Sequence, residues 1–315
     1  MENQCVGLAG ALGLEPIVKR VRLRQPWRIL SPYLRVGLRH AFDEPLAPPW
    51  PDLLIASGRL SVAASIYARA RSARAGKACF TIQIQDPVIS TRHFDIVVAP
   101  LHDALDGPNV ISTLGALHGI APEKIEEGAK TLAAHISGLA PPYIGVLVGG
   151  ANGAYRLGRE QILDLAQQLR KLADGSKASL LVTPSRRTGS DNIALLRDSL
   201  KDTAAFVWDG QGANPYFGIL GLSQTLIVTA DSVNMITEAC ASGKPVYIFD
   251  LPGGSTKAAR FHRAIIAGDH ARKFTLPLEP YSVAPLHEMA RVAGEIKRRL
   301  DERKPDHGLP GPHAQ

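Results

Sequence analysis

The sequence predicts an α/β protein made of two Rossmann-like domains, each with a parallel sheet flanked by helices. Its length of 315 residues indicates two domains, at about 150 residues per domain, and each can bury its own core. Short apolar runs without alternation recur along the chain, which is typical of strands buried on both faces. Stretches with helical periodicity separate these runs, and that order favours parallel sheets covered by helices.

The first half holds the first group of expected strands. They cover residues 51–57, 78–85, 94–100 and 109–113. A helix is expected over residues 59–76. Pro141-Pro142 cannot continue a helix, so we place the first domain at residues 1–140.

The second half repeats the alternation. Its expected strands cover residues 143–150, 178–184, 204–208, 225–230 and 244–250, with helices near 158–174 and 190–200. These elements form a second domain at residues 143–275. A last helix is expected over residues 285–303, and the Pro/Gly-rich tail at 304–315 is expected to be disordered.

The composition excludes several classes of protein. With 45% hydrophobic and 21% charged residues the chain is globular, and it has no apolar run near the ~20 residues that cross a bilayer. Its three cysteines match no metal-ligand spacing, so no metal site is expected. We find no secretory signal, and a cytoplasmic location, soluble or peripheral on the inner membrane face, is the expectation.

Basic residues gather near the amino terminus. The net charge is +7, and no acid lies among the basic residues between Ile17 and His40, which are Lys19, Arg20, Arg22, Arg24, Arg28, Arg35 and Arg39. A solvated basic surface explains this as well as an anionic partner does, such as a phospholipid surface or a lipid-linked phosphate. Nucleic acid ranks last, since we find no helix-turn-helix, zinc or RNA-binding aromatic signature.

Ligands of doubly wound sheets bind beyond the carboxyl ends of the strands, so the residues after each strand are the candidates. In "GGANGAYRLG", glycines free the backbone to approach a phosphate, although most such glycines merely make a turn. In "TPSRRTGS", adjacent arginines could clamp a diphosphate or form a solvated loop. The candidates from these two loops are Gly149, Gly150, Asn152, Ser185, Arg186 and Arg187.

Two later loops add candidates. Asn214 lies in "WDGQGANPYFG" and could line a base or sugar pocket, although a plain turn is the likelier role on local evidence. Asp231 or Ser232 can cap the helix that follows the strand at 225–230. Glu238 lies roughly opposite the apolar stripe of that helix, and its position alone favours a solvated surface acid.

The stretch "ADSVNMITEACASGKPVYIFDLP" is similar to the carboxyl-half signature of GT-B glycosyltransferases. In that signature a glutamate holds the ribose hydroxyls of the donor nucleotide. The resemblance implies that Glu238 accepts hydrogen bonds from a ribose diol, while amides near Ser232 meet a phosphate. The donor would be a nucleoside-diphosphate sugar, and no metal would be required, because arginines and helix amino termini stabilise the leaving diphosphate.

A longer series of motifs resembles the elongated-mitochondria (ELM) fission protein family. They are "ENQCVGLAGALGL", "IQDPVISTRHFDIVVAPLHD", "NVISTLGALHGI", "VLVGGANGAYRLG", "TPSRRTG" and "GANPYFGILGLSQTLIVTADSVNMITEACASGKPVYIF", among others. The bacterial members of that family are regarded as candidate GT-B glycosyltransferases. Its plant members are known for recruiting fission machinery at the mitochondrial surface. The resemblance implies two Rossmann-like domains facing a cleft, with the last helix packing back on the first domain.

The first domain would then bind the acceptor. A GT-B enzyme needs a base there, and Asp86 and His118 are the chosen candidates ahead of His102 and Asp103. For each of them alone, a loop cap or a satisfied polar residue is the likelier role. Family members have a strand and a glycine turn before the "ENQ" motif, so we expect the first sheet to lack a strand or the start to lie upstream.

The function expected from these features is glycosyl transfer from a nucleoside-diphosphate sugar to a lipid-linked or envelope saccharide at the cytoplasmic membrane face. The alternative is a non-catalytic protein that keeps the fold and docks on a membrane or a partner. An NAD-dependent epimerase is the poorest match, because "GGANGAYRLG" lacks the Gly-x-Gly-x-x-Gly order.

Overall fold

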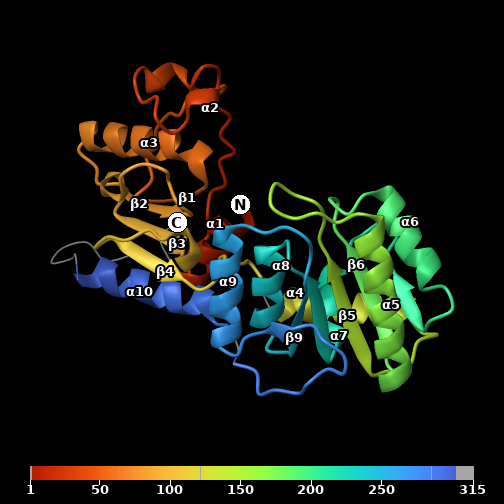
Figure 1. The fold of residues 1–315 in the computed structure, drawn as a ribbon. Coiled ribbons are helices and arrows are strands. Elements are labelled where there is room, and N and C mark those ends of the chain that lie inside the picture. Colours follow the sequence, from red (N-terminus) through yellow and green to blue (C-terminus); the bar gives the residue numbers. More distant parts are fainter. Residues whose placement is uncertain (1, 121, 285, 303–315) are drawn as a thin grey trace. The chain divides into compact units, whose positions relative to one another are not determined.

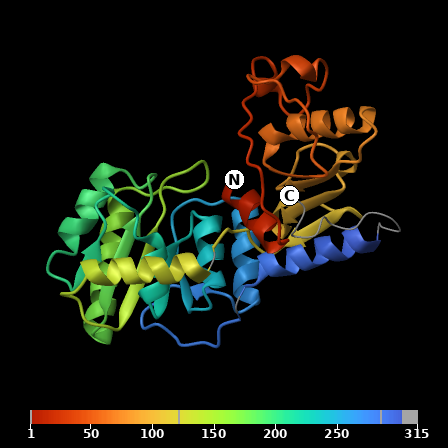
Figure 2. The ribbon, with the colours of Figure 1, turned by 180° about the vertical axis from the view of Figure 1, so that it is seen from behind.

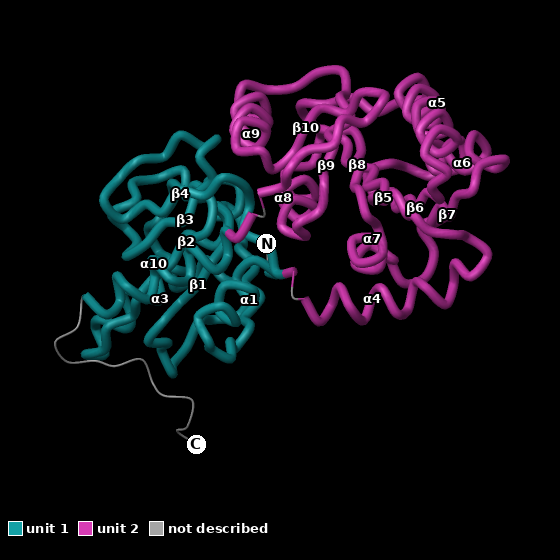
Figure 3. Tube along the Cα trace, turned by 90° about the horizontal axis from the view of Figure 1, so that it is seen from below, with its two compact units in different colours: residues 1–119, 288–315 teal, residues 120–287 magenta. Residues whose placement is uncertain are grey.

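The computed structural model describes residues 2–120, 122–284 and 286–302. The chain divides into two compact units (Figure 3): unit 1 takes residues 1–119 and 288–315, and unit 2 takes residues 120–287. The expected tail at 304–315 lies outside the described residues.

The boundary between the units differs from the one expected at Pro141. Helix α4 (Pro122–His135) belongs to unit 2, where it packs along α7 (Tyr216–Leu222). Glycines allow this close approach, since a Cβ on Gly128 would lie 2.7 Å from the amide nitrogen of Gly218. The packing of α4 on α7 leaves no local signal in the sequence. Pro141-Pro142 does leave one, and the boundary was therefore expected there.

Unit 1 contains a four-stranded parallel sheet in the order β1-β2-β3-β4 (Figure 1). Its strands are β1 (Leu53–Ser57), β2 (Phe80–Ile84), β3 (Ile96–Pro100) and β4 (Val110–Thr113). Each lies inside a range expected from the sequence. Ile55 is opposite Ile82, and Ile82 is opposite Ile96, so apolar side chains align across the sheet.

Helices cover both faces of this sheet. On one face α1 (Glu2–Ala11) and α10 (Glu288–Glu302) pack with the strands, and on the other lies α3 (Val62–Arg74). The carboxylate of Glu288 accepts a hydrogen bond from the Leu114 amide, at 2.8 Å, and so fixes the start of α10. The last expected helix is thus part of unit 1. Shorter elements of the unit are α2 (Trp27–Leu30) and the 3₁₀ turns Leu38–His40, Arg59–Ser61, Thr91–His93 and Leu101–Asp103.

Unit 2 contains a six-stranded parallel sheet in the order β10-β9-β8-β5-β6-β7. Its strands are β5 (Tyr143–Val148), β6 (Ser179–Pro184), β7 (Ala205–Val207), β8 (Thr225–Thr229), β9 (Val246–Phe249) and β10 (Arg272–Lys273). The chain winds outward from β5 to β7 and then returns to the other side of β5. This is the doubly wound order of dinucleotide-binding folds. Only β10 was not expected, because two basic residues carry no strand pattern.

Helices also cover both faces of the second sheet. Helices α5 (Arg159–Ser176) and α6 (Ser190–Ser199) lie on one face, and α4, α7 and α8 (Val233–Ala241) lie on the other (Figures 2 and 3). Helix α9 (Thr256–Ala267) follows β9. The α/β architecture of parallel sheets flanked by helices is therefore as expected. Among the described residues, no helix is long and apolar enough to span a bilayer, and no group of three or more His, Cys, Asp or Glu side chains is arranged to hold a metal ion.

Candidate functional site

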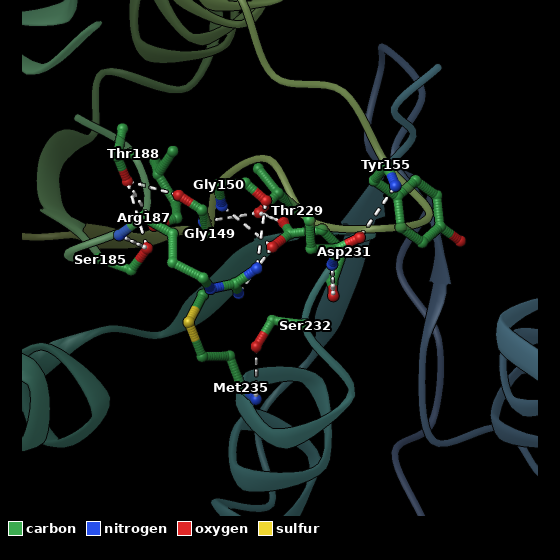
Figure 4. Close-up of polar contacts among 12 residues, drawn as sticks. Gly149, Gly150, Tyr155, Ser185, Arg187, Thr188, Thr229, Asp231, Ser232 and Met235 are labelled. Carbon is green, nitrogen blue, oxygen red and sulfur yellow. Dashed lines mark hydrogen bonds and ion pairs between the residues drawn. The ribbon is translucent and has the colours of Figure 1, made fainter. Parts of the chain in front are cut away.

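The candidate site of unit 2 lies where the winding of its sheet reverses. Strands β5 and β8 are neighbours, but the chain leaves β5 toward β6 and leaves β8 toward β9. The crevice at such a switch point, beyond the carboxyl ends of the strands, is the usual binding site of this architecture. We call the loops at this end, residues 149–155, 185–188 and 230–232, the carboxyl edge of unit 2 (Figure 4).

Asp231 joins these loops. Its side chain is fully buried and receives hydrogen bonds from the Thr229 hydroxyl at 2.7 Å and the Gly150 amide at 2.9 Å. The Arg187 guanidinium donates a third bond to it, also at 2.9 Å. The expected helix cap is supplied by Ser232, whose hydroxyl accepts from the Met235 amide. Asp231 therefore links three loops and leaves the capping of α8 to its neighbour.

Gly149 and Gly150 are required by this packing. A Cβ on Gly149 would lie 2.2 Å from both carboxylate oxygens of Asp231, and a Cβ on Gly150 would lie 2.2 Å from the Arg187 carbonyl oxygen. The Gly149 amide donates to the Thr229 hydroxyl at 2.8 Å. Both glycine amides thus have acceptors inside the protein, and the close backbone approach in this loop is to Asp231 and Thr229.

Asn152 shapes the rest of the first loop. Its side-chain oxygen accepts from the amides of Ala154 and Tyr155, and its amide group donates to the Asp231 carbonyl at 3.1 Å. The loop then pairs with residues 252–254, where Gly253 faces Tyr155. Asn152 is consequently a turn-former whose remaining donor ties the loop to the start of α8.

The second loop is a tight turn from Ser185 to Thr188. The Ser185 hydroxyl accepts from the Arg187 amide at 3.2 Å, and the buried Thr188 hydroxyl donates to the Gly149 carbonyl. This turn separates the two expected arginines. Arg187 is anchored on Asp231, whereas Arg186 is exposed and has no hydrogen-bond or ion-pair partner among the described residues.

Glu238 is not the solvated acid that its position on the helix suggested. Its carboxylate is half-buried and accepts a hydrogen bond from the hydroxyl of Tyr216, at the start of α7. Burial raises the pKa of Glu238, and the bond from Tyr216 partly opposes that rise. Asn214 accepts from the Thr183 hydroxyl and the Tyr216 amide, each at 3.0 Å, and so positions the tyrosine.

Helix α8 presents its amino terminus beside these groups. The first amides of a helix have no acceptor within the helix, and they carry a partial positive charge. Ser232 satisfies only the Met235 amide. The carboxyl edge of unit 2 therefore has free helix amides and the exposed Arg186, which are donors for an anion. The Glu238 carboxylate lies one to two turns further along α8.

At the carboxyl edge of unit 1, two loops meet on the uncharged side chain of Gln4. Gln4 of α1 is buried, and its side-chain oxygen accepts from the Ser57 hydroxyl at 3.1 Å and from the Gln85 side chain at 3.3 Å. Asp86 is half-buried, and one of its oxygens accepts from the Val88 amide at 2.8 Å, which is the loop-cap role. Gln85 and Val88 both have positive φ, of 71° and 62°, so this loop carries backbone strain.

His118 lies at the end of unit 1. Both of its ring nitrogens are buried and have no hydrogen-bond partner among the described residues. Burial lowers the pKa of the imidazole, and the Glu288 carboxylate partly opposes that effect. The other two candidates for the base, His102 and Asp103, also have buried side chains. The imidazole of the first lies 3.7 Å from the carboxylate of the second.

Sequence reasoning missed Thr229, Thr188 and Lys244. The two threonines hold the glycine loop. Thr229 is the last residue of β8 and Thr188 belongs to the loop after β6, so their place near strand ends was the available signal. Lys244 donates to the carbonyls of Leu220 and Gly221 and so closes α7. Burial lowers the pKa of its ammonium group to about 8.

Comparison with known proteins identifies the family. Residues 1–300 match the model of the family described as mitochondrial fission ELM1. The chain is 29% identical over 282 residues to the mitochondrial fission protein ELM1 of Arabidopsis thaliana, covering 80% of this chain but only 65% of the plant protein. It is 26% identical to uncharacterized protein RP120 of Rickettsia prowazekii, covering 79% of this chain and 80% of that one.

Solved structures similar to the chain include enzymes that act on nucleotide sugars. One is the UDP-GlcNAc 2-epimerase of Methanocaldococcus jannaschii, at 11% identity and a TM-score of 0.48 over 79% of this chain and 77% of that one. Another is E. coli ADP-heptose LPS heptosyltransferase II, at 13% identity and a TM-score of 0.39 over 80% and 78%. Neither similarity is strong enough to indicate a substrate. The family match extends over both units, and the chain belongs to the mitochondrial fission ELM1 family.

Proposed function

We propose that the chain is a glycosyltransferase that moves a sugar from a nucleoside-diphosphate sugar to a lipid-linked or envelope saccharide at the cytoplasmic membrane face. Unit 2 would bind the donor at its carboxyl edge, and unit 1 would bind the acceptor. Family membership and the doubly wound sheet of unit 2 support this assignment.

The observation that carries the proposal is the Glu238–Tyr216 pair. A solvated glutamate on α8 would need no partner, yet this one is half-buried and held by the Tyr216 hydroxyl. That bond uses one carboxylate oxygen, and the other can accept from a ribose hydroxyl. The carboxylate follows the start of α8 by one to two turns, so a nucleotide with its diphosphate at the helix terminus would extend its ribose toward Glu238.

Charge stabilisation of the leaving diphosphate would come from Arg186 and the first amides of α8. Arg187 is less suited, since its guanidinium already neutralises Asp231. Fixed donors aimed at a developing negative charge are the largest single source of catalysis in many enzymes. The proposal therefore needs no metal ion at this edge.

The base would come from unit 1. His118 suits this role because burial lowers the pKa of its imidazole, so the ring is neutral near pH 7 and can accept a proton from an acceptor hydroxyl. Asp86 is the second candidate, with one oxygen committed to the Val88 amide and one left to accept a proton.

A thermal-shift screen tests the proposal. The wild-type protein is melted with nucleosides, nucleoside diphosphates and their sugars, and ligands at 100 times their Kd should stabilise it by about 2.7 kcal/mol. We expect diphosphates and their sugars to raise the Tm more than the matching nucleosides do. No shift with any of them, in a protein that melts cooperatively, would contradict donor binding.

The alternative is a non-catalytic docking protein. The bonds among Asp231, Gly149, Gly150 and Thr229 favour it, because they leave these groups satisfied without a ligand. A silent screen would support this alternative.

A further inference from the structure

The segment from Ile17 to Val36 exposes an unusual number of large apolar side chains. Ile17 is 90% exposed, Val36 80%, Ile29 70% and Tyr33 68%, and Val18, Val21 and Leu30 are also exposed. Elsewhere in the described chain, such side chains are exposed singly and at scattered positions: Val6, Leu60, Val88, Leu101 and Leu163. Scattered apolar residues need no explanation, but seven exposed ones within residues 17–36 indicate an interaction surface.

The outward direction of these side chains is fixed by packing on the inner side. Leu23, Leu38 and Phe42 are buried against α3, together with the partly buried Trp27. The Trp27 indole donates to the Val36 carbonyl at 2.9 Å and so holds the two arms of the segment together. The segment therefore has one face docked on unit 1 and an apolar face that nothing in the described chain covers.

Cations are interleaved with this apolar face. Lys19, Arg22 and Arg28 are exposed and have no acidic partner among the described residues. The other three arginines of the segment have partners: Arg20 pairs with Glu2 at 2.8 Å, Arg24 pairs with Asp43 at 3.5 Å, and Arg35 contacts the ring of His93. The structure thus separates the free cations from the paired ones, which the sequence alone could not do.

We propose that this segment docks unit 1 on an anionic phospholipid leaflet, with Ile29, Tyr33 and Val36 entering the headgroup boundary and the free cations binding the phosphates. Apolar anchors flanked by Lys and Arg are the pattern of interfacial membrane binding. Tyrosine, with an apolar ring and a polar tip, suits that boundary. A nucleic acid would use the cations but gives no role to exposed aliphatic side chains. The docking does not depend on the proposed sugar transfer.

The test is co-sedimentation with vesicles of phosphatidylcholine, with and without added phosphatidylglycerol, over a range of salt. We expect the wild type to bind only the anionic vesicles. A charge variant, Lys19→Gln/Arg22→Gln/Arg28→Gln, should lose up to about fivefold in binding per residue at low salt. An apolar variant, Ile29→Ser/Tyr33→Ser/Val36→Ser, should bind several-fold more weakly at every salt concentration.

A matched control removes three exposed cations from α5 of unit 2, in Arg159→Gln/Arg170→Gln/Lys171→Gln. It should bind vesicles as the wild type does, and all variants should keep the wild-type Tm, since the changed side chains are exposed. Equal binding by the apolar variant and the wild type would overturn insertion. The proposal would be overturned if the wild type bound neutral vesicles as strongly as anionic ones, or if the α5 control lost its binding to anionic vesicles. It would also be overturned if the protein formed a dimer in solution that only the apolar variant breaks.

Discussion

The carboxyl edges of the two sheets are built from different chemistry. In unit 2 a buried carboxylate, Asp231, ties three loops together through a guanidinium, a hydroxyl and an amide. In unit 1 the corresponding loops meet on a neutral side chain, Gln4, and the nearby His118 has no partner at all among the described residues. The network of unit 2 is centred on a charge, whereas that of unit 1 is neutral and lies in the same unit as a buried imidazole without a hydrogen-bond partner among the described residues.

This difference suits the roles that we propose. A nucleoside diphosphate presents the same charged groups whatever sugar it carries, so a rigid edge with a free arginine and helix amides fits it. An acceptor hydroxyl needs a group that can take a proton, and a buried neutral imidazole can do so.

The largest effect is expected at Gly149. In Gly149→Ala the new Cβ would lie 2.2 Å from the Asp231 carboxylate, so the loop must shift and lose its bonds. We expect about 3 kcal/mol less free energy of unfolding for unit 2, at the upper end of overpacking costs. The matched control is Gly153→Ala in the same loop, where a Cβ would meet nothing within 4 Å. Similar denaturant midpoints for the two variants would show that the Asp231 network is not rigid.

The two edges are compared directly by Asp231→Asn and Gln4→Ala. Asp231→Asn removes the charge that pairs with Arg187, and we expect a loss of about 2–3 kcal/mol, reduced from the buried-pair range because the guanidinium is partly exposed. Gln4→Ala removes two neutral hydrogen bonds and should cost about 1–2 kcal/mol. Chemical denaturation followed with a separate probe in each unit measures both. A larger loss for Gln4→Ala would reverse the contrast.

The two arginines of the second loop should behave differently. Arg186→Ala should weaken the binding of a nucleoside diphosphate by about tenfold, leave the free nucleoside unaffected and keep the Tm, because the side chain is exposed. Arg187→Ala should lower the Tm, since it leaves the buried Asp231 carboxylate without its cation. Equal losses for nucleoside and diphosphate in Arg186→Ala would mean that the arginine does not bind phosphate.

The smallest effect concerns His118 and pH. Because burial lowers the pKa of its imidazole, the unfolded chain binds more protons than the folded one between that pKa and the ordinary value of 6.5. The free energy of unfolding should therefore fall as pH drops through this window, and the fall should be shallower in His118→Gln. An NMR titration assigned with the same variant gives the pKa directly. A pKa above the ordinary value of 6.5 would contradict the effect of burial, and one well above 7 would exclude a neutral imidazole as the base near pH 7.

Much of the fold could be predicted, because buried parallel strands and amphipathic helices each have a local pattern. Apolar runs located every strand except β10, which is two basic residues long. The boundary between the units could not be found in the same way. It depends on the packing of α4 on α7 through Gly128 and Gly218, which lie far apart in the sequence.

The loops of the candidate site could be named from the sequence, but the bonds among them could not. Residues after strand ends were the candidates, and the sheet order brings those loops together. The roles of Asp231 and Glu238 depend on partners in other elements: Gly150 and Arg187 for the first, and Tyr216 for the second. A local pattern shows a residue's place on its own helix or loop, but not what another loop places against it.

In the proposed function, Glu238 binds the ribose of a nucleoside-diphosphate donor. The most direct measurement is calorimetric titration of the wild type, Glu238→Gln and a control, Glu127→Gln, which changes an exposed glutamate on α4, with the nucleotide sugar that gives the largest thermal shift. The account predicts that Glu238→Gln binds about 1–3 kcal/mol more weakly than the wild type, with an unchanged Tm, and that Glu127→Gln binds as the wild type does. Wild-type affinity in Glu238→Gln would contradict it.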